Sequence, residues 1–230
     1  MRIGGLQKTS LLDYPNTVSA IIWTIGCNFK CPFCYNPNLV NDTIDDISED
    51  EVFSFLKKRK NILDGLSISG GEPLLQPDIV DFITKVKNLG YLVKIDTNGS
   101  YPEKLQELID KNLIDYIAMD IKAPKEKYNK ITGMKIDIRR IEKSIEIIQK
   151  SNLSYEFKTT FVPDLLVKED IIAIAQWIKG SHTYYLQQFK ADAPLISPEV
   201  QKKCPYSKEY VTETYNVIRS QFDTCEIRGV

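Results

Sequence analysis

The chain has 230 residues, of which 43% are hydrophobic, enough to bury a sizeable core as one large domain or two small ones. Its 30 basic and 31 acidic residues leave a formal net charge of -1, a balance that does not point to a nucleic-acid or membrane-binding surface. The N-terminus lacks an apolar signal segment, and no stretch approaches the ~18 apolar residues of a membrane span. We therefore expect a cytoplasmic protein that binds neither nucleic acid nor membrane.

Segments typical of strands alternate with segments typical of helices along the whole chain. We expect strands at residues 17–25, 64–69, 91–96, 113–122, 154–162 and 183–189, and a short last strand at 225–230. We expect helices at residues 48–60, 76–90, 101–112, 137–151, 168–180 and 207–222. Apolar strands separated by helices predict a parallel α/β sheet with both faces covered.

Nothing in the sequence divides the chain into parts. It contains no internal repeat and no Gly/Ser linker, so we expect a single domain over residues 1–230. The longest irregular stretch, residues 188–207, contains Pro194, Pro198 and Pro205 and predicts a functional or mobile loop.

Three of the five cysteines, Cys27, Cys31 and Cys34, directly follow the first expected strand. Clustered cysteines in a reducing compartment are more often metal ligands or catalytic thiols than disulfides, and thiolates suit iron or zinc. A structural zinc site takes four ligands, and the remaining candidates, Cys204, Cys225 and His182, are isolated far along the chain. A 4Fe-4S cluster also has four irons, so three cysteines would leave one iron for a ligand that is not protein.

Other unusual residues also follow or end expected strands. They are SGGEP from Ser69 to Pro73, DTNG from Asp96 to Gly99, MDIK from Met119 to Lys122, Lys158, and the pair Gln187 and Gln188. Because α/β sheets and barrels build their sites at the carboxyl ends of parallel strands, we expect these segments to meet the cysteines in one site.

The stretch CNFKCPFC, with Phe33 just before the third cysteine, resembles the CxxxCxxC loop of the radical S-adenosylmethionine (SAM) superfamily. This resemblance implies a partial (β/α)6 TIM-like barrel of parallel strands and a 4Fe-4S cluster held by Cys27, Cys31 and Cys34. It implies that SAM chelates the open iron and is cleaved reductively to a 5′-deoxyadenosyl radical that abstracts a hydrogen atom. Phe33 would shield the cofactor.

SGGEP resembles the GGEP motif of that superfamily, which holds the methionyl amino group of SAM. Gly70 and Gly71 have no Cβ, so their backbone can approach a ligand closely, and Glu72 adds negative charge near a cationic amine.

DTNG and MDIK are similar to segments of the glycyl-radical-enzyme activases. The resemblance implies that Asp96, Thr97, Asp120 and Lys122, with Asn98 beside them, surround the SAM carboxylate, sometimes together with a monovalent cation. The sequence differs from this family at two positions. Gln187 stands where many activases have a histidine near the nucleoside, and Tyr35 stands where many relatives have a histidine after the third cysteine.

The opening, from GGLQKTSLLDYPN through the cysteines, resembles the activating proteins of anaerobic ribonucleoside-triphosphate reductase, and the ending CEIRGV is similar to that group. The resemblance implies an enzyme that abstracts a hydrogen from a glycine of a partner protein and leaves a stored glycyl radical. Its partners would be anaerobic ribonucleotide reductase as protein substrate and an electron donor such as flavodoxin or ferredoxin.

Two other interpretations stay open. A radical SAM enzyme acting on a small molecule, such as a 7-carboxy-7-deazaguanine synthase-like protein, can be equally short, but LLDYPN lacks the Gly-Glu-Gly stretch that those proteins usually show. A binding module with a zinc knob or an electron-carrying cluster would leave GGEP, DTNG and MDIK without a purpose.

Overall fold

The computed structural model describes all of residues 1–230, and one sheet of eight strands runs through it in chain order. Neighbouring strands are parallel from β2 onward, whereas β1 pairs with β2 in the antiparallel sense. The strands are β1 (Ile3–Ser10), β2 (Ser19–Thr24), β3 (Gly65–Gly70), β4 (Leu92–Thr97), β5 (Tyr116–Asp120), β6 (Ser154–Phe161), β7 (Thr183–Gln188) and β8 (Thr224–Arg228).

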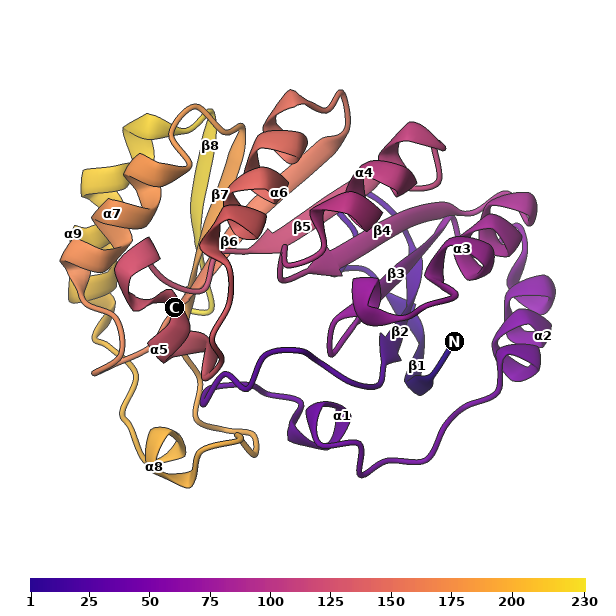
Figure 1. Cartoon of the computed structure of the whole chain (residues 1–230), viewed down its shortest axis with the longest axis horizontal. Helices are drawn as coiled ribbons and strands as arrows, with labels where there is room; N and C mark the ends of the chain where they lie inside the picture. The colour runs from indigo at the N-terminus through magenta and orange to yellow at the C-terminus, as the bar shows by residue number, and fades with distance from the viewer.

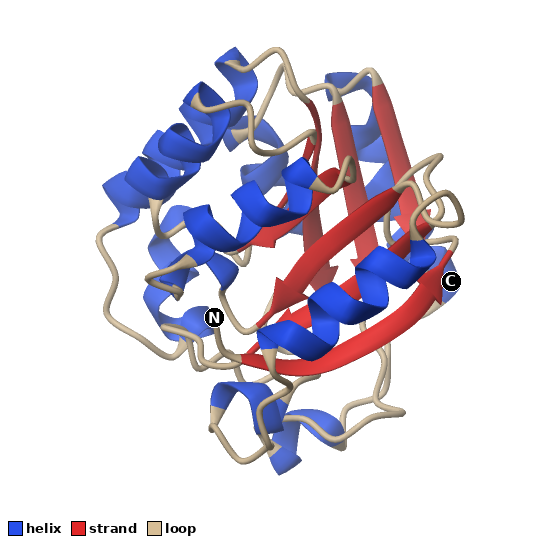
Figure 2. Cartoon of the chain, turned by 90° about the vertical axis from the view of Figure 1, so that its right-hand side faces the viewer, coloured by secondary structure: helices blue, strands red, loops and turns tan.

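Helices follow the strands and cover the outer face of the sheet, which curves strongly (Figures 1 and 2). The α-helices are α1 (Pro37–Val40), α2 (Glu49–Arg59), α3 (Ile79–Asn88), α4 (Pro102–Asp110), α5 (Tyr128–Thr132), α6 (Ile138–Lys150), α7 (Lys168–Trp177), α8 (Pro198–Gln201) and α9 (Lys208–Ile218). Short 3-10 turns lie at Pro73–Leu75, Lys125–Lys127 and Arg219–Gln221. None of the helices combines the length and the apolar character that crossing a membrane requires.

The predicted partial (β/α)6 barrel is confirmed in β2 through β7, each of which is followed by a helix before the next strand. The sheet does not close, since β1 and β8 are its two edges and do not pair with each other. β1 is an addition that the sequence did not indicate, and β8 matches the short last strand expected at residues 225–230. A single domain over residues 1–230 stays a prediction.

The core lies between the outer face of the sheet and the helices. Ile68, Ile95 and Phe157 are fully buried on this face, and alternate residues of the same strands point the other way, into the barrel. There the sequence expectation of two apolar faces is wrong, because the inner face carries charged side chains such as Lys94 and Glu156. An open barrel keeps its inner face for a site, so only the outer face is uniformly apolar.

Candidate active site

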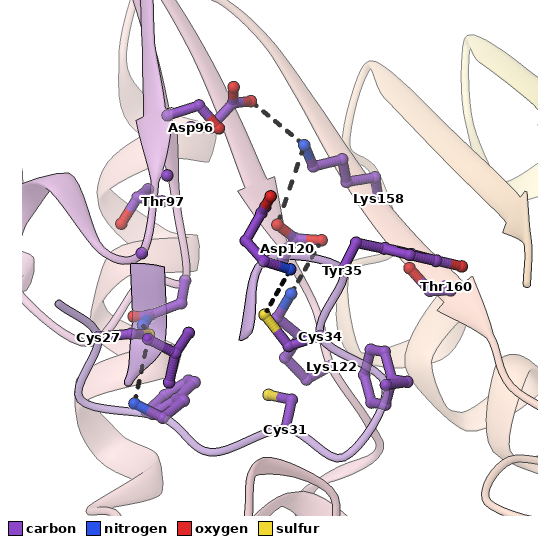
Figure 3. Close-up of a pocket in the computed structure, with 18 of the residues that line it drawn as sticks. Cys27, Cys31, Cys34, Tyr35, Asp96, Thr97, Asp120, Lys122, Lys158 and Thr160 are labelled. Atoms are coloured by element: carbon purple, nitrogen blue, oxygen red, sulfur yellow. Dashed lines mark hydrogen bonds and ion pairs between the residues drawn. The ribbon is translucent and has the colours of Figure 1, made fainter. Parts of the chain in front are cut away.

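A cavity lies at the carboxyl ends of the parallel strands and is lined by residues from β3, β4, β5, β6 and β7 and from the loop after β2. It brings together almost every residue that the sequence nominated. The nominated residues that line it are Cys27, Cys31, Phe33, Cys34, Gly70, Gly71, Asp96, Thr97, Asn98, Asp120, Lys122 and Gln187. Figure 3 shows the cysteines at one end of this cavity and the charged residues of the strands at the other.

The cysteines belong to a loop, residues 26–36, that we call the cysteine loop. All three thiols are free, and polar hydrogens point at two of the sulfurs. The Phe29 amide donates to Cys27 Sγ over 3.4 Å and the Asn36 amide donates to Cys34 Sγ over 3.5 Å. Amide donors of this kind favour negative charge on sulfur, which suits thiolates that ligate iron.

Burial keeps the thiols of Cys27 and Cys31 protonated at neutral pH in the cluster-free protein. It raises the pKa of Cys27 to about 11 and the pKa of Cys31 to about 12, although Lys122 opposes the shift at both sulfurs and the Phe29 amide opposes it at Cys27. Metal ligation by these sulfurs must therefore release protons.

Backbone hydrogen bonds anchor the cysteine loop on both sides. The Gly26 amide donates to the Leu39 carbonyl over 2.8 Å, and the Lys30 amide donates to the Thr132 carbonyl over 2.8 Å. The Glu72 amide donates to the Gly26 carbonyl over 2.9 Å and ties the loop to the end of β3. The loop is thus positioned by the surrounding chain.

Among the residues expected to hold the cluster or SAM, Glu72 is the one that does not line the cavity. Its carboxylate is fully buried and accepts hydrogen bonds from the Leu74 amide, from the Thr97 hydroxyl over 2.8 Å and from the Asn98 amide over 2.7 Å. It therefore joins the end of β3 to the segment after β4. A contact of Glu72 with the SAM amine stays a prediction.

A chain of alternating charges crosses the inner face of β4, β5 and β6 (Figure 3). Asp96 Oδ1 lies 2.8 Å from Lys94 Nζ and 3.2 Å from Lys158 Nζ. Lys158 Nζ lies 3.9 Å from Asp120 Oδ2, and Asp120 Oδ1 lies 3.2 Å from Lys122 Nζ. Sequence reasoning placed Lys158 near the site but gave it no role, since its partners lie on strands far away in the chain.

Lys122 connects this chain of charges to the cysteine loop. Its Nζ lies 5.9 Å from the centroid of the Phe33 ring, within cation–π range. Burial lowers the pKa of Lys122, but Asp120 and the sulfurs of Cys31 and Cys34 outweigh it and hold the pKa above its ordinary value. The side chain is therefore a permanent cation inside the cavity, suited to a carboxylate ligand.

Tyr35, whose role the sequence left open, fastens the irregular stretch 188–207 to the cysteine loop. Its hydroxyl accepts a hydrogen bond from the Lys190 amide over 2.8 Å, and its ring lies 6.5 Å from that of Phe189. The Ser197 amide also donates to the Pro32 carbonyl over 2.9 Å. These contacts hold the stretch beside the cysteine loop, although none of its residues lines the cavity.

The remaining nominated groups lie apart from the cavity. Gln188 donates to the Tyr206 carbonyl over 2.6 Å, so only its neighbour Gln187 lines the cavity. Cys204 is exposed, Cys225 lies on β8, and His182 pairs with Asp223 at the surface. Missed lining residues include Phe29, Val40 and Thr160, which carried no signal because apolar and hydroxyl side chains are common everywhere.

Comparison with known proteins agrees with this architecture. A model of the radical SAM superfamily matches residues 21–178. Crystal structures of Streptococcus suis SuiB bound to the precursor peptide SuiA and of a domain of a pyruvate-formate lyase-activating enzyme from Bacteroides vulgatus share the fold. The SuiB match has a TM-score of 0.67 and 16% identity, and it covers 90% of this chain and 47% of SuiB. The Bacteroides vulgatus match has a TM-score of 0.54 and 17% identity, and it covers 72% of this chain and 99% of that domain. This chain thus spans about half the length of SuiB.

Two sequence relatives refine the assignment. A Methanocaldococcus jannaschii protein, named for glycyl-radical enzyme activation, is 36% identical over 99% of this chain and 96% of its own length. The pyruvate formate-lyase-activating enzyme of Clostridium pasteurianum is 27% identical over 78% of this chain and 76% of its own. The chain therefore belongs to the radical SAM superfamily and, within it, to the family of glycyl-radical enzyme activating enzymes.

Proposed function

We propose that this protein activates a glycyl-radical enzyme, with anaerobic ribonucleoside-triphosphate reductase as the partner, by abstracting a hydrogen atom from a backbone glycine. The observation that carries the proposal is the match to a glycyl-radical enzyme activating protein over 99% of this chain, supported by the cavity that gathers the three cysteines and Lys122. The choice of reductase rests on the resemblance of the opening segment and of the ending CEIRGV.

The donor set fits the cluster that the superfamily implies. Three free cysteines line one cavity, and their sulfurs do not form a group that could hold one metal ion in common. A 4Fe-4S cluster gives each cysteine an iron of its own and keeps one iron for SAM, so Cys27, Cys31 and Cys34 would hold it. When bound, the cluster supplies the electron that cleaves SAM.

The chain's own residues bind and orient the cofactor. Gly70 and Gly71 offer backbone at the end of β3, and Lys122 offers a cation to the SAM carboxylate. Phe33 covers the side of the cavity next to Lys122 and excludes water from it. Gln187 provides an amide for the nucleoside.

The open barrel supports a protein as the substrate. Because β1 and β8 do not pair, the barrel has a gap between its two edge strands. We infer that a segment of a larger protein binds at this gap. The partner would close this gap and keep water from the radical. An electron donor such as flavodoxin or ferredoxin completes the proposed set of partners.

The test mixes the anaerobically reconstituted, reduced protein and SAM with the anaerobic reductase and records the electron-spin-resonance spectrum. We expect a glycyl doublet on the reductase and one equivalent of 5′-deoxyadenosine per radical formed. Cys31→Ala, which removes a cluster ligand, should give neither product. Pyruvate formate-lyase serves as the second partner.

A doublet only with pyruvate formate-lyase would contradict the choice of reductase but keep the activase proposal. Release of 5′-deoxyadenosine without a radical on either protein would contradict the activase proposal itself.

A further inference from the structure

A lysine side chain lies between the two aspartates that the activase resemblance associates with a monovalent cation. Lys158 Nζ is 3.2 Å from Asp96 Oδ1 and 3.9 Å from Asp120 Oδ2. Lys158, Asp96 and Asp120 all line the cavity at the carboxyl ends of the strands. The ammonium thus lies where both carboxylates can reach it, which is what a bound cation would require.

The charge balance leaves no demand for a further cation. Asp96 also pairs with Lys94 Nζ at 2.8 Å, and Asp120 also pairs with Lys122 Nζ at 3.2 Å. Two carboxylates therefore face three ammonium groups. The side chains are well shielded from water, with exposed fractions of 4% for Lys94 and 20% for Lys158, so a potassium or sodium ion would meet weakly screened repulsion.

The sheet fixes the position of the ammonium. Lys158 on β6 is the register partner of Asp120 on β5, so their side chains leave the sheet on the same face, side by side. Asp96 lies on the inner face of β4, next in the sheet to β5. The lysine side chain, with its four methylene groups, therefore reaches from β6 across β5 to Asp96 without any loop having to move.

Asp96 and Lys158 are both ionised at neutral pH. Burial raises the pKa of Asp96, but Lys158 and Lys94 outweigh it and hold the pKa well below its usual range. Burial lowers the pKa of Lys158, but Asp96 and Asp120 outweigh it and keep the pKa above its ordinary value. The ammonium is therefore a fixed positive charge, as a bound ion would be.

We propose that the Lys158 ammonium takes the place of the monovalent cation, so that SAM binding by this chain needs neither potassium nor sodium. Lys158 is a positioning residue: it holds Asp96 and Asp120 together, and through Asp120 it sets the place of Lys122. The inference rests on the proposal that this cavity binds SAM.

The first experiment measures the dissociation constant of SAM by calorimetry on the cluster-loaded protein, in potassium chloride and in tetramethylammonium chloride. We expect the wild-type value to agree within about twofold between the two salts. Lys158→Ala opens an ion-sized space between the aspartates, so its affinity should fall about tenfold in tetramethylammonium, equivalent to ~1.4 kcal/mol, and recover in potassium. Lys87→Ala removes a lysine paired with Asp115 away from the cavity and should behave as wild type.

The second experiment measures sodium binding to the cluster-free protein by line broadening in sodium NMR. Wild type should show no saturable site and Lys158→Ala should gain one. A saturable site in wild type, or a tenfold potassium effect on its SAM affinity, would overturn the inference. If neither wild type nor Lys158→Ala bound SAM in any salt, the proposed function would fail. Even then, a sodium site gained only in Lys158→Ala would support the inference that the Lys158 ammonium takes the place of the cation.

Discussion

At the scale of single residues, burial decides what the acidic groups of this site can do. Asp96 has two lysine partners and stays ionised, whereas Glu72 is fully buried and has none within salt-bridge distance. Burial raises the pKa of Glu72 to about 7, although the Asn98 amide, the Thr97 hydroxyl and the Leu74 amide all favour its charged form. Near neutral pH the two carboxylates therefore differ in charge: Asp96 on β4 is ionised, and Glu72, two residues after β3, is partly protonated.

This difference makes the stability of the cluster-free protein depend on pH through Glu72. The folded pKa of about 7 is above the ordinary value of 4.5, so the folded protein binds more protons than the unfolded chain between those values. The free energy of unfolding of wild type, relative to Glu72→Gln, should fall by about 3 kcal/mol as the pH rises from 4.5 to 7, and then level off. Urea unfolding of both proteins across this window checks it, and a constant difference would refute it.

Residue identity predicted much of the site but not its connections. The rare spacing of Cys27, Cys31 and Cys34 identifies them as candidate ligands from the sequence alone. The glycines of SGGEP follow after the next strand. Lys158 and Tyr35 could not be assigned in the same way. Their roles depend on contacts with Asp96 and Lys190, which only the assembled sheet and loops bring into reach.

At the scale of elements, the site depends on how closely the end of β3 approaches the cysteine loop. A Cβ on Gly71 would lie 1.9 Å from the Gly26 carbonyl oxygen, and one on Gly70, where φ is +121°, would lie 2.2 Å from the Thr24 amide nitrogen. Both obstacles are backbone atoms, so neither can be avoided by a side-chain rotation. The GGEP glycines thus let strand and loop touch, in addition to any contact with a cofactor.

Gly71→Ala should therefore push the cysteine loop away from β3. We expect iron content after reconstitution to fall below about a tenth of wild type, with a loss of stability of at least about 2 kcal/mol from the overpacking. Gly90→Ala is the matched control, because φ there is +90° but no atom lies within 4 Å of the added Cβ. That variant should lose about 1–2 kcal/mol of stability and keep its iron. Equal iron content in the two variants would disprove the packing argument.

The one strand that sequence reasoning missed is β1. Its sequence IGGLQKTS has two glycines and a polar end, and its burial alternates poorly, so it shows neither a strand period nor an apolar run. It forms because β2 offers an edge: Leu6 pairs with Ile22 and Gln7 with Ile21. The helices α1, α5 and α8 were missed because four or five residues are too few to show a helical period.

At the scale of the whole molecule, residues far apart in the chain close the region beside the cysteines. The stretch 188–207, with α8 inside it, hangs below β7 in Figure 1 and approaches the segment that holds α1. The hydrogen bonds from Lys190 to Tyr35 and from Ser197 to Pro32 fasten it there. The sequence predicted that this stretch is irregular, and its attachment follows only from the three-dimensional arrangement.

Tyr35→Phe should loosen this attachment and little else. Loss of one hydrogen bond, worth about 1 kcal/mol, should speed amide exchange over residues 189–197 roughly fivefold. Hydrogen-exchange mass spectrometry measures this directly. Tyr210→Phe is the control, since its hydroxyl accepts from the Lys168 amide instead and its loss should affect exchange only there. Unchanged exchange over residues 189–197 in Tyr35→Phe would show that Ser197 and the Phe189 ring hold the stretch alone.

The backbone anchors of the cysteine loop have a consequence for repair. Three main-chain hydrogen bonds hold the loop in place, and none of them involves a sulfur. They run from Gly26 to Leu39, from Lys30 to Thr132 and from Glu72 to Gly26. If oxygen destroyed the iron–sulfur cluster, the cysteine loop would therefore keep its conformation. Iron, sulfide and reduced cysteine thiols would then be enough to rebuild the cluster on the folded protein, without an unfolded intermediate.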